Sequence, residues 1–266
     1  MLELLDYTFF RNALLGIAIL SIVGGILGSY IVTRRLVSIS GGITHACFGG
    51  LGLGYFMGWP PLIMAMVFAI ASALGVQMLG ARGHVREDSA IAIVWAAGMA
   101  IGVTFVFLSP GAVPELNAFL FGSILTITSL DLQLLGAFAA ALIIVITIWF
   151  RRIQACAFDP DFMSVIGIRA WFWNGLMTLF IAVGIVLMIR CVGMMLLMSM
   201  LSLPPLTAEL FTRRLRAMIP AAVAVSAIGS IGGLLLATAV NVPASALIVA
   251  LQALLYALAA LLQKLK

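Results

Sequence analysis

The sequence predicts an all-α membrane protein, a polytopic bundle of eight to nine transmembrane helices that forms a single domain over residues 1–266. Hydrophobic residues make up 64% of the chain and charged residues only 9%, with a mean hydropathy of +1.26. A soluble domain would need a more charged surface. Apolar stretches of about 20 residues, the length with which an α-helix crosses the hydrocarbon, recur along the chain. They lack the polar and apolar alternation of membrane β-strands.

Nine such stretches can be drawn. The first is preceded by Glu3, Asp6 and Arg11 and is longer than a signal-peptide core, so we expect a permanent helix rather than a cleaved leader. The seventh follows the sixth with almost no turn, which leaves the count at eight or nine. The stretches are 12–33, 36–58, 61–80, 89–108, 130–150, 171–189, 191–208, 217–240 and 244–262.

The basic residues predict the orientation of the bundle. If the N-terminus is outside and nine spans alternate, only Arg11 and Arg190 of the 14 basic residues fall outside. Such an excess of cytoplasmic Lys and Arg is the positive-inside pattern. It explains the net charge of +5 without a nucleic-acid partner.

Two connections outside the membrane carry structural signals. Trp59-Pro60-Pro61 predicts a tight outer turn between the second and third stretches, because proline cannot continue a helix interior. The outer segment 109–129 contains two prolines and then a short apolar piece, 119–125, which is too short to span. We expect a short re-entrant or interfacial helix there.

The longest cytoplasmic connection is residues 151–170. Asp159-Pro160 predicts a helix start, with the aspartate as cap and the proline at the first helical position. Gly167 is placed to end a helix of about two turns. These residues alone are compatible both with a docking element for another protein and with an ordinary connecting turn.

His45 is the most informative residue of the spans. It lies ten residues after Arg35, or about 15 Å at the helical rise, near the middle of a core of about 30 Å. A neutral imidazole is a common metal ligand, and ionisable residues at this depth are usually functional. A single interhelical hydrogen bond is the alternative. Small residues on the same helix would allow close packing of neighbouring backbones, namely Gly41, Gly42, Gly49, Gly50 and Gly52.

Several chemistries lack their motifs. The sequence has no GxxxxGK[ST] loop, no HExxH and no GxSxG, and the three cysteines have no paired spacing. We therefore expect a conduit rather than an enzyme. If ATP drives transport, a separate subunit must hydrolyse it.

Five segments, in order, resemble the permease subunits of metal-importing ABC transporters, the zinc and manganese family. The first, residues 33–58, reads TRRLVSISGGITHACFGGLGLGYFMG and is similar to the second-helix region of that family. The other four are Arg86–Ile91, Leu120–Leu125, Phe158–Phe162, and Val192-Gly193 through Leu203-Pro204.

The resemblance implies a multi-pass permease in a bacterial plasma (inner) membrane, with an architecture resembling the vitamin B12 importer permease. It also implies a homodimer, two cytosolic ATPase subunits, an extracytoplasmic metal-binding protein, and no permanently bound cofactor. His45 matches the family's histidine, a metal ligand in the translocation path. The segment 158–167 matches the coupling helix that enters the ATPase, which favours docking; its residues are Phe158, Asp159, Pro160, Asp161, Phe162 and Gly167.

One departure bears on the transported ion. The family usually has aspartate four residues before its histidine, and Gly41 stands there in this sequence. Losing carboxylates affects oxygen-preferring ions most, whereas zinc accepts nitrogen ligands readily. The sequence therefore favours Zn2+, then Mn2+ or Fe2+. A siderophore or vitamin B12-type permease, and an ATP-independent metal channel or carrier, are the alternatives.

Overall fold

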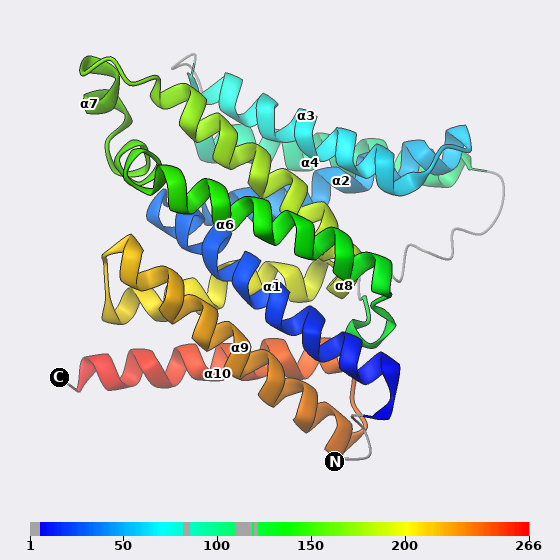
Figure 1. Cartoon of the computed structure of the whole chain (residues 1–266). Coiled ribbons are helices and arrows are strands. Elements are labelled where there is room, and N and C mark those ends of the chain that lie inside the picture. The colour runs from blue at the N-terminus through cyan, green and yellow to red at the C-terminus, as the bar shows by residue number, and fades with distance from the viewer. Residues whose placement is uncertain (1–5, 82–85, 110–118, 120–121, 266) are drawn as a thin grey trace. The chain divides into compact units, whose positions relative to one another are not determined.

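A computed structural model describes residues 6–81, 86–109, 119 and 122–265, and within these ranges the chain is helical and contains no strand (Figure 1). The helices alternate with short connections, as expected for a polytopic bundle. Their bounds are α1 Thr8–Thr33, α2 Val37–Met57, α3 Pro61–Ala81, α4 Glu87–Leu108, η2 Ile124–Thr126, α6 Ser129–Phe158, α7 Pro160–Val165, α8 Ala170–Phe211, α9 Leu215–Val240 and α10 Ala244–Lys264.

Seven of the described helices are long and apolar enough to cross a membrane. One of them, α8, has 42 residues, about twice the length that one crossing needs. At Gly193 its backbone leaves the helical region (φ 77°, ψ 170°), which divides α8 into two helical arms. These arms correspond to the sixth and seventh apolar stretches. The 21-residue α2 is not among the seven, because its glycines, serines and histidine lower its hydropathy.

The chain divides into two compact units. Unit 1 comprises residues 1–33, 117–145 and 187–266, and unit 2 comprises residues 34–116 and 146–186. The helices α6 and α8 therefore contribute to both units.

In unit 1, α1 packs against α9 and η2, and α9 packs against α10. Small residues permit this packing: a Cβ added at Gly233 of α9 would lie 2.5 Å from the Ile248 Cα of α10. A buried polar chain joins three helices, because Ser199 Oγ donates to Gln252 Oε1 (2.7 Å) and Gln252 Nε2 contacts Ser230 Oγ (3.2 Å). Such bonds satisfy polar groups that lipid cannot.

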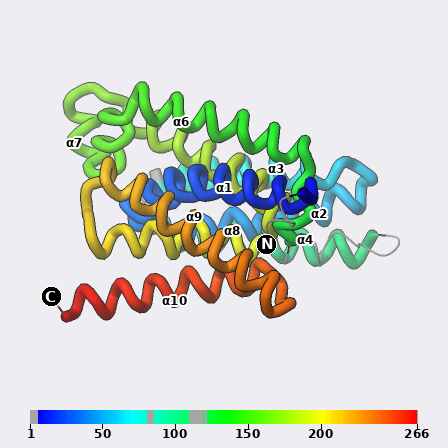
Figure 2. Tube along the Cα trace, turned by 60° about the horizontal axis from the view of Figure 1, so that its bottom comes forward, coloured from blue at the N-terminus to red at the C-terminus, as the bar shows by residue number. Residues whose placement is uncertain are grey.

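In unit 2, α2 lies against both α3 and α4, which also contact each other; Figures 1 and 2 show these three helices side by side. The turn from α2 to α3 has the form that Trp59-Pro60-Pro61 predicts. Gly58 caps α2 in the left-handed conformation (φ 68°), and α3 begins at Pro61.

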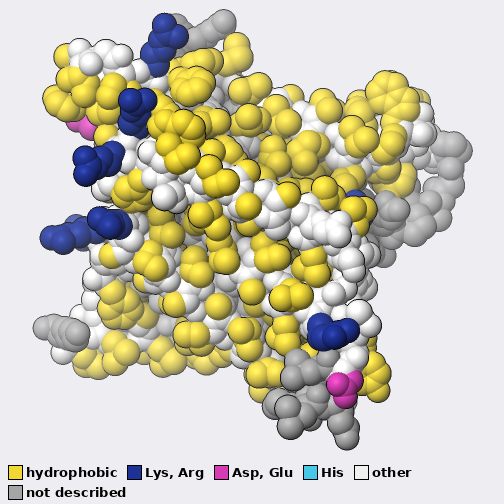
Figure 3. Space-filling view, viewed as in Figure 1, with side chains coloured by type: hydrophobic (Ala, Val, Ile, Leu, Met, Phe, Trp, Pro, Cys, Tyr) yellow, Lys and Arg dark blue, Asp and Glu magenta, His cyan; other side chains and the backbone are white. Residues whose placement is uncertain are grey.

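Hydrophobic side chains cover most of the face shown in Figure 3, with few charged side chains among them. Large apolar side chains in mid-helix are exposed, for example Ile144 of α6 (56%) and Ile228 of α9 (64%). A soluble protein seldom exposes apolar surface on this scale, so these side chains are suited to contact lipid.

Candidate functional site

Glycines bring α2 unusually close to its two neighbours. A Cβ added at Gly42 would lie 2.5 Å from Ile91 Cγ2 of α4, and one at Gly98 of α4 would lie 2.5 Å from the Ala46 Cα. Cβ contacts below 3.0 Å essentially never occur. Five glycines of α2 have an added Cβ that would overlap a neighbouring helix: Gly42 and Gly52 would meet α4, Gly50 and Gly54 would meet α3, and Gly49 would meet both. Gly41 is also buried.

His45 is the only residue from Ile39 to Gly52 of α2 that is not buried. Its imidazole stacks on the indole of Trp95 from α4, with ring centroids 4.6 Å apart and an interplanar angle of 5°. Its Nδ1 is buried and has no hydrogen-bond partner in the part of the chain that the structure describes. The ring is therefore held by its face, while its Nδ1 is engaged by no described protein group.

The α2–α4 contact places Trp95 over His45. Ile91, Trp95, Gly98 and Gly102 follow 4-3-4 spacing, which puts them on one face of α4. Ile91, Gly98 and Gly102 pack against α2, so the indole between them is held against the same helix. Among the described residues, no group of three or more His, Cys, Asp or Glu side chains could hold a metal ion.

Polar contacts join the N-terminal ends of α2 and α4. Arg34 Nη2 lies 3.3 Å from Glu87 Oε1, and Ser38 Oγ donates to Asp88 Oδ1 at 3.0 Å. These contacts set the register of α4 against α2, and hence the height of Trp95 relative to His45.

The segment 158–167 forms a short capped helix, α7. The Phe162 N–H donates to the Asp159 carboxylate (2.9 Å), and Pro160 occupies the first helical turn. Gly167 adopts φ 82°, and Ile168 N donates to Met163 O (2.9 Å), which completes a Schellman cap. The side chains of Phe158 (56%) and Phe162 (58%) are exposed, and Asp161 lies in the first turn.

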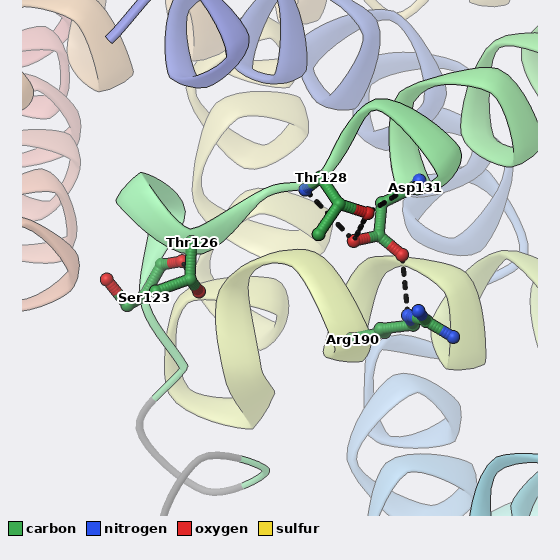
Figure 4. A network of polar contacts seen from close by, with 5 residues as sticks. All are labelled: Ser123, Thr126, Thr128, Asp131 and Arg190. Carbon is green, nitrogen blue, oxygen red and sulfur yellow. Dashed lines mark hydrogen bonds and ion pairs between the residues drawn. The ribbon is translucent and has the colours of Figure 1, made fainter. Parts of the chain in front are cut away.

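A charged network in unit 1 was not predicted from the sequence (Figure 4). Thr128 and Asp131 cap the start of α6 reciprocally: the Thr128 N–H and hydroxyl donate to Asp131 Oδ2 (3.1 and 2.6 Å), and the Asp131 N–H donates to Thr128 Oγ1 (3.2 Å). The other oxygen of Asp131 pairs with Arg190 Nε of α8 at 2.5 Å. A T-x-x-D pattern is a sequence signal that could have revealed the cap, but the sequence carries no signal for the arginine.

His45 and α7 thus belong to two separate sites of unit 2. Trp95 was also missed by sequence reasoning, although the spacing of Ile91, Gly98 and Gly102 signals the face on which it lies. The expected outer helix at 119–125 is described only in part, because residues 120–121 lie outside the described ranges; η2 covers Ile124–Thr126.

Known proteins resemble this chain along nearly its whole length. It is 34% identical over 239 residues to a "Probable metal transport system membrane protein" of Chlamydia muridarum, covering 87% of this chain and 81% of that protein. It is 29% identical over 246 residues to the manganese transport system membrane protein MntC of Listeria monocytogenes, covering 92% and 88%. The solved structure of PsaBC from Streptococcus pneumoniae in complex with Fab superposes with a TM-score of 0.83 at 26% identity, covering 97% of this chain and 94% of that chain.

The strongest finding concerns the family. The family described as "ABC 3 transport family" matches residues 6–263. This range contains α1 to α9 entirely and all of α10 except Lys264. The chain therefore belongs to the ABC 3 transport family, as a multi-pass membrane permease subunit of the ABC transporter type.

Proposed function

We propose that this chain is the permease subunit of an ATP-driven importer of divalent transition metal ions, with zinc as the main cargo and manganese or iron as weaker ones. The observation that carries the proposal is the environment of His45. His45 is the one partly exposed residue along the buried length of α2, it stacks on Trp95, and a neutral imidazole is a common metal ligand. The names of the relatives from Chlamydia muridarum and Listeria monocytogenes, which refer to metal and manganese transport, support the same class of cargo.

The proposed working unit is a homodimer in a bacterial plasma membrane. A second copy brings a second His45 to the translocation path. Two imidazoles without the family's aspartates, whose position Gly41 occupies, are a nitrogen-rich donor set, which suits zinc better than manganese.

ATP is hydrolysed by cytosolic partner subunits that hold α7, and an extracytoplasmic binding protein delivers the ion. The capped α7 is a short, pre-formed helix with exposed Phe162 at its centre and exposed Phe158 two residues before its first residue. This form suits it to insertion in a cleft of the ATPase. Movement of α7 on ATP binding then opens the path to alternate sides of the membrane.

The test is ATP-dependent zinc uptake, with manganese as competitor, in proteoliposomes that hold this chain, its ATPase and its binding protein. We expect His45→Ala to lower uptake about tenfold or more, since removing even a residue that supports a metal ligand often costs ~10–100-fold. Thr104→Ala removes an exposed hydroxyl of α4 that bonds to Ala100 O of the same helix (2.8 Å), and this variant should transport normally. Retention of the ATPase by both variants separates a lost ligand from lost assembly.

Normal uptake by His45→Ala would make His45 a structural residue and move the metal path elsewhere. Uptake that persists without ATP would instead favour a channel or carrier.

A further inference from the structure

A groove with about 580 Å³ of space lies in unit 2, where α6 ends and α8 begins. Its lining is Arg152 of α6, residues 167–169 of the turn after α7, and residues 171–173 of the first turn of α8. The volume is in the range of small-ligand sites, ~300–1,000 Å³. Gly167 leaves its side of the turn open, because a Cβ there would meet nothing within 4 Å.

The floor of the groove is aromatic and rigid. Trp173 is 8% exposed and is packed by Phe172, edge to face at 5.5 Å, and by Trp149 of α6 at 5.8 Å. The guanidinium of Arg152 lies over the Trp173 ring, 5.8 Å from its centroid. A cation–π contact uses no N–H donor of the guanidinium in a hydrogen bond, so the tryptophan holds Arg152 without neutralising it.

The groove carries two arginines that form no ion pair with a described carboxylate. Arg152 and Arg169 line it, and neither belongs to the ion pairs found among the described residues, which are Arg34–Glu87 and Arg190–Asp131. No Asp or Glu is among the lining residues. Two arginines without a carboxylate are suited to a phosphate group, which a guanidinium binds through two parallel N–H donors.

We propose that this groove binds the phosphate headgroup of an anionic phospholipid. Trp171 (60%) and Phe172 (53%) expose their rings at its rim, at the start of a helix long and apolar enough to span the membrane. Aromatic rings at span ends are typical of the interface between headgroups and acyl chains. The charge asymmetry predicts the cytoplasmic leaflet for this end, where anionic lipids concentrate and basic pockets between helices hold them. The site involves neither His45 nor the transported metal.

Lipid retention by the purified chain tests the proposal. Native mass spectrometry would count bound phosphatidylglycerol and phosphatidylcholine, added at equal concentration, on the wild type and on Arg152→Gln/Arg169→Gln. We expect the wild type to prefer phosphatidylglycerol and the double variant to bind it at least fivefold more weakly. The control is Arg213→Gln/Arg216→Gln, which removes two exposed arginines outside the groove and should keep wild-type binding.

A second measurement holds even if the double variant folds poorly. Wild type exposed to a photoactivatable phosphatidylglycerol should crosslink within residues 149–173, and inorganic phosphate at millimolar concentration should not displace the lipid. Equal binding of the two lipids, equal losses in the control, or crosslinks confined to other segments would overturn the proposal. So would a double variant that keeps phosphatidylglycerol but loses the ATPase subunit, because the groove would then be a protein contact.

Discussion

At the scale of single residues, the stack of His45 on Trp95 determines how the imidazole can act. An aromatic ring that covers one face leaves the ring edge, where the two nitrogens lie, uncovered by the stack. The stack also limits rotation of the imidazole without consuming a donor or an acceptor. Trp95 is thus well placed to orient His45. An effect of this orientation on transport rests on the proposed role of His45.

Substitution of Trp95 tests this orienting role. Trp95→Leu keeps an apolar side chain but removes the ring, and we expect zinc uptake with a several-fold higher KM and nearly unchanged ATPase retention. Trp95→Phe restores an aromatic face and should return KM close to the wild-type value. If the phenylalanine variant is as impaired as the leucine variant, or if neither changes KM, the stack has no part in metal handling.

At the scale of elements, α7 depends on its caps, because a helix of six residues is too short to be stable alone. Asp159→Ala removes the acceptor for the Phe162 N–H, a loss of about 1 kcal/mol for a typical cap. Phe162→Ala removes an exposed ring but leaves the cap intact. We expect either variant to lower co-purification of the ATPase, and the double variant to abolish it.

Ser164→Ala is the matched control for α7. It removes an exposed hydroxyl that bonds only within the helix, to Pro160 O at 2.9 Å, and should retain the ATPase. Full ATPase retention by the Asp159→Ala/Phe162→Ala variant would mean that α7 is a connecting turn, and that the contact lies elsewhere.

The elements show which local signals sequence reasoning can use. Asp159, Pro160 and Gly167 act within their own turns, so the capped helix was predictable. The apolar stretches predict a break in α8 near residue 190, but it lies at Gly193, because hydropathy does not show where a backbone turns. The second arm continues through Pro204 and Pro205 to Phe211; a Cβ added at Gly28 of α1 would lie 2.6 Å from Pro205 Cγ, so tertiary packing sustains this arm.

At the scale of the whole molecule, hydropathy and charge predicted the fold class, since lipid requires helices with internally bonded backbones. They could not predict which helix faces meet. Trp95 lies 50 residues from His45 in sequence, and Arg190 lies 59 residues from Asp131. A histidine or a capping aspartate can be recognised alone, but its partner on another helix requires the packing of both.

The charges within unit 1 lead to a prediction about orientation. At one end, Asn12 Nδ2 donates to Ile127 O (3.2 Å) and Arg190 pairs with Asp131. At the other, Gln263 Nε2 donates to Leu210 O (2.9 Å), which places the end of α10 beside the end of α8. The arm Met194–Phe211 separates these ends by about 27 Å, close to the hydrocarbon thickness. Arg11 and Arg190 therefore belong to one end, whereas Arg213, Arg214, Arg216 and Lys264 belong to the other.

The positive-inside pattern then puts the N-terminus outside and the C-terminus in the cytoplasm. Asp6→Cys should react with a membrane-impermeant maleimide on intact cells, and Lys264→Cys only after permeabilisation. The native cysteines are buried, at 0%, 0% and 2% exposure for Cys47, Cys156 and Cys191, so the unsubstituted chain serves as the unlabelled control. Labelling of both positions from outside would require an even number of crossings, and the two arms of α8 would then not both cross the membrane. Reversed labelling would place α7 and the arginine groove outside, away from any cytosolic ATPase.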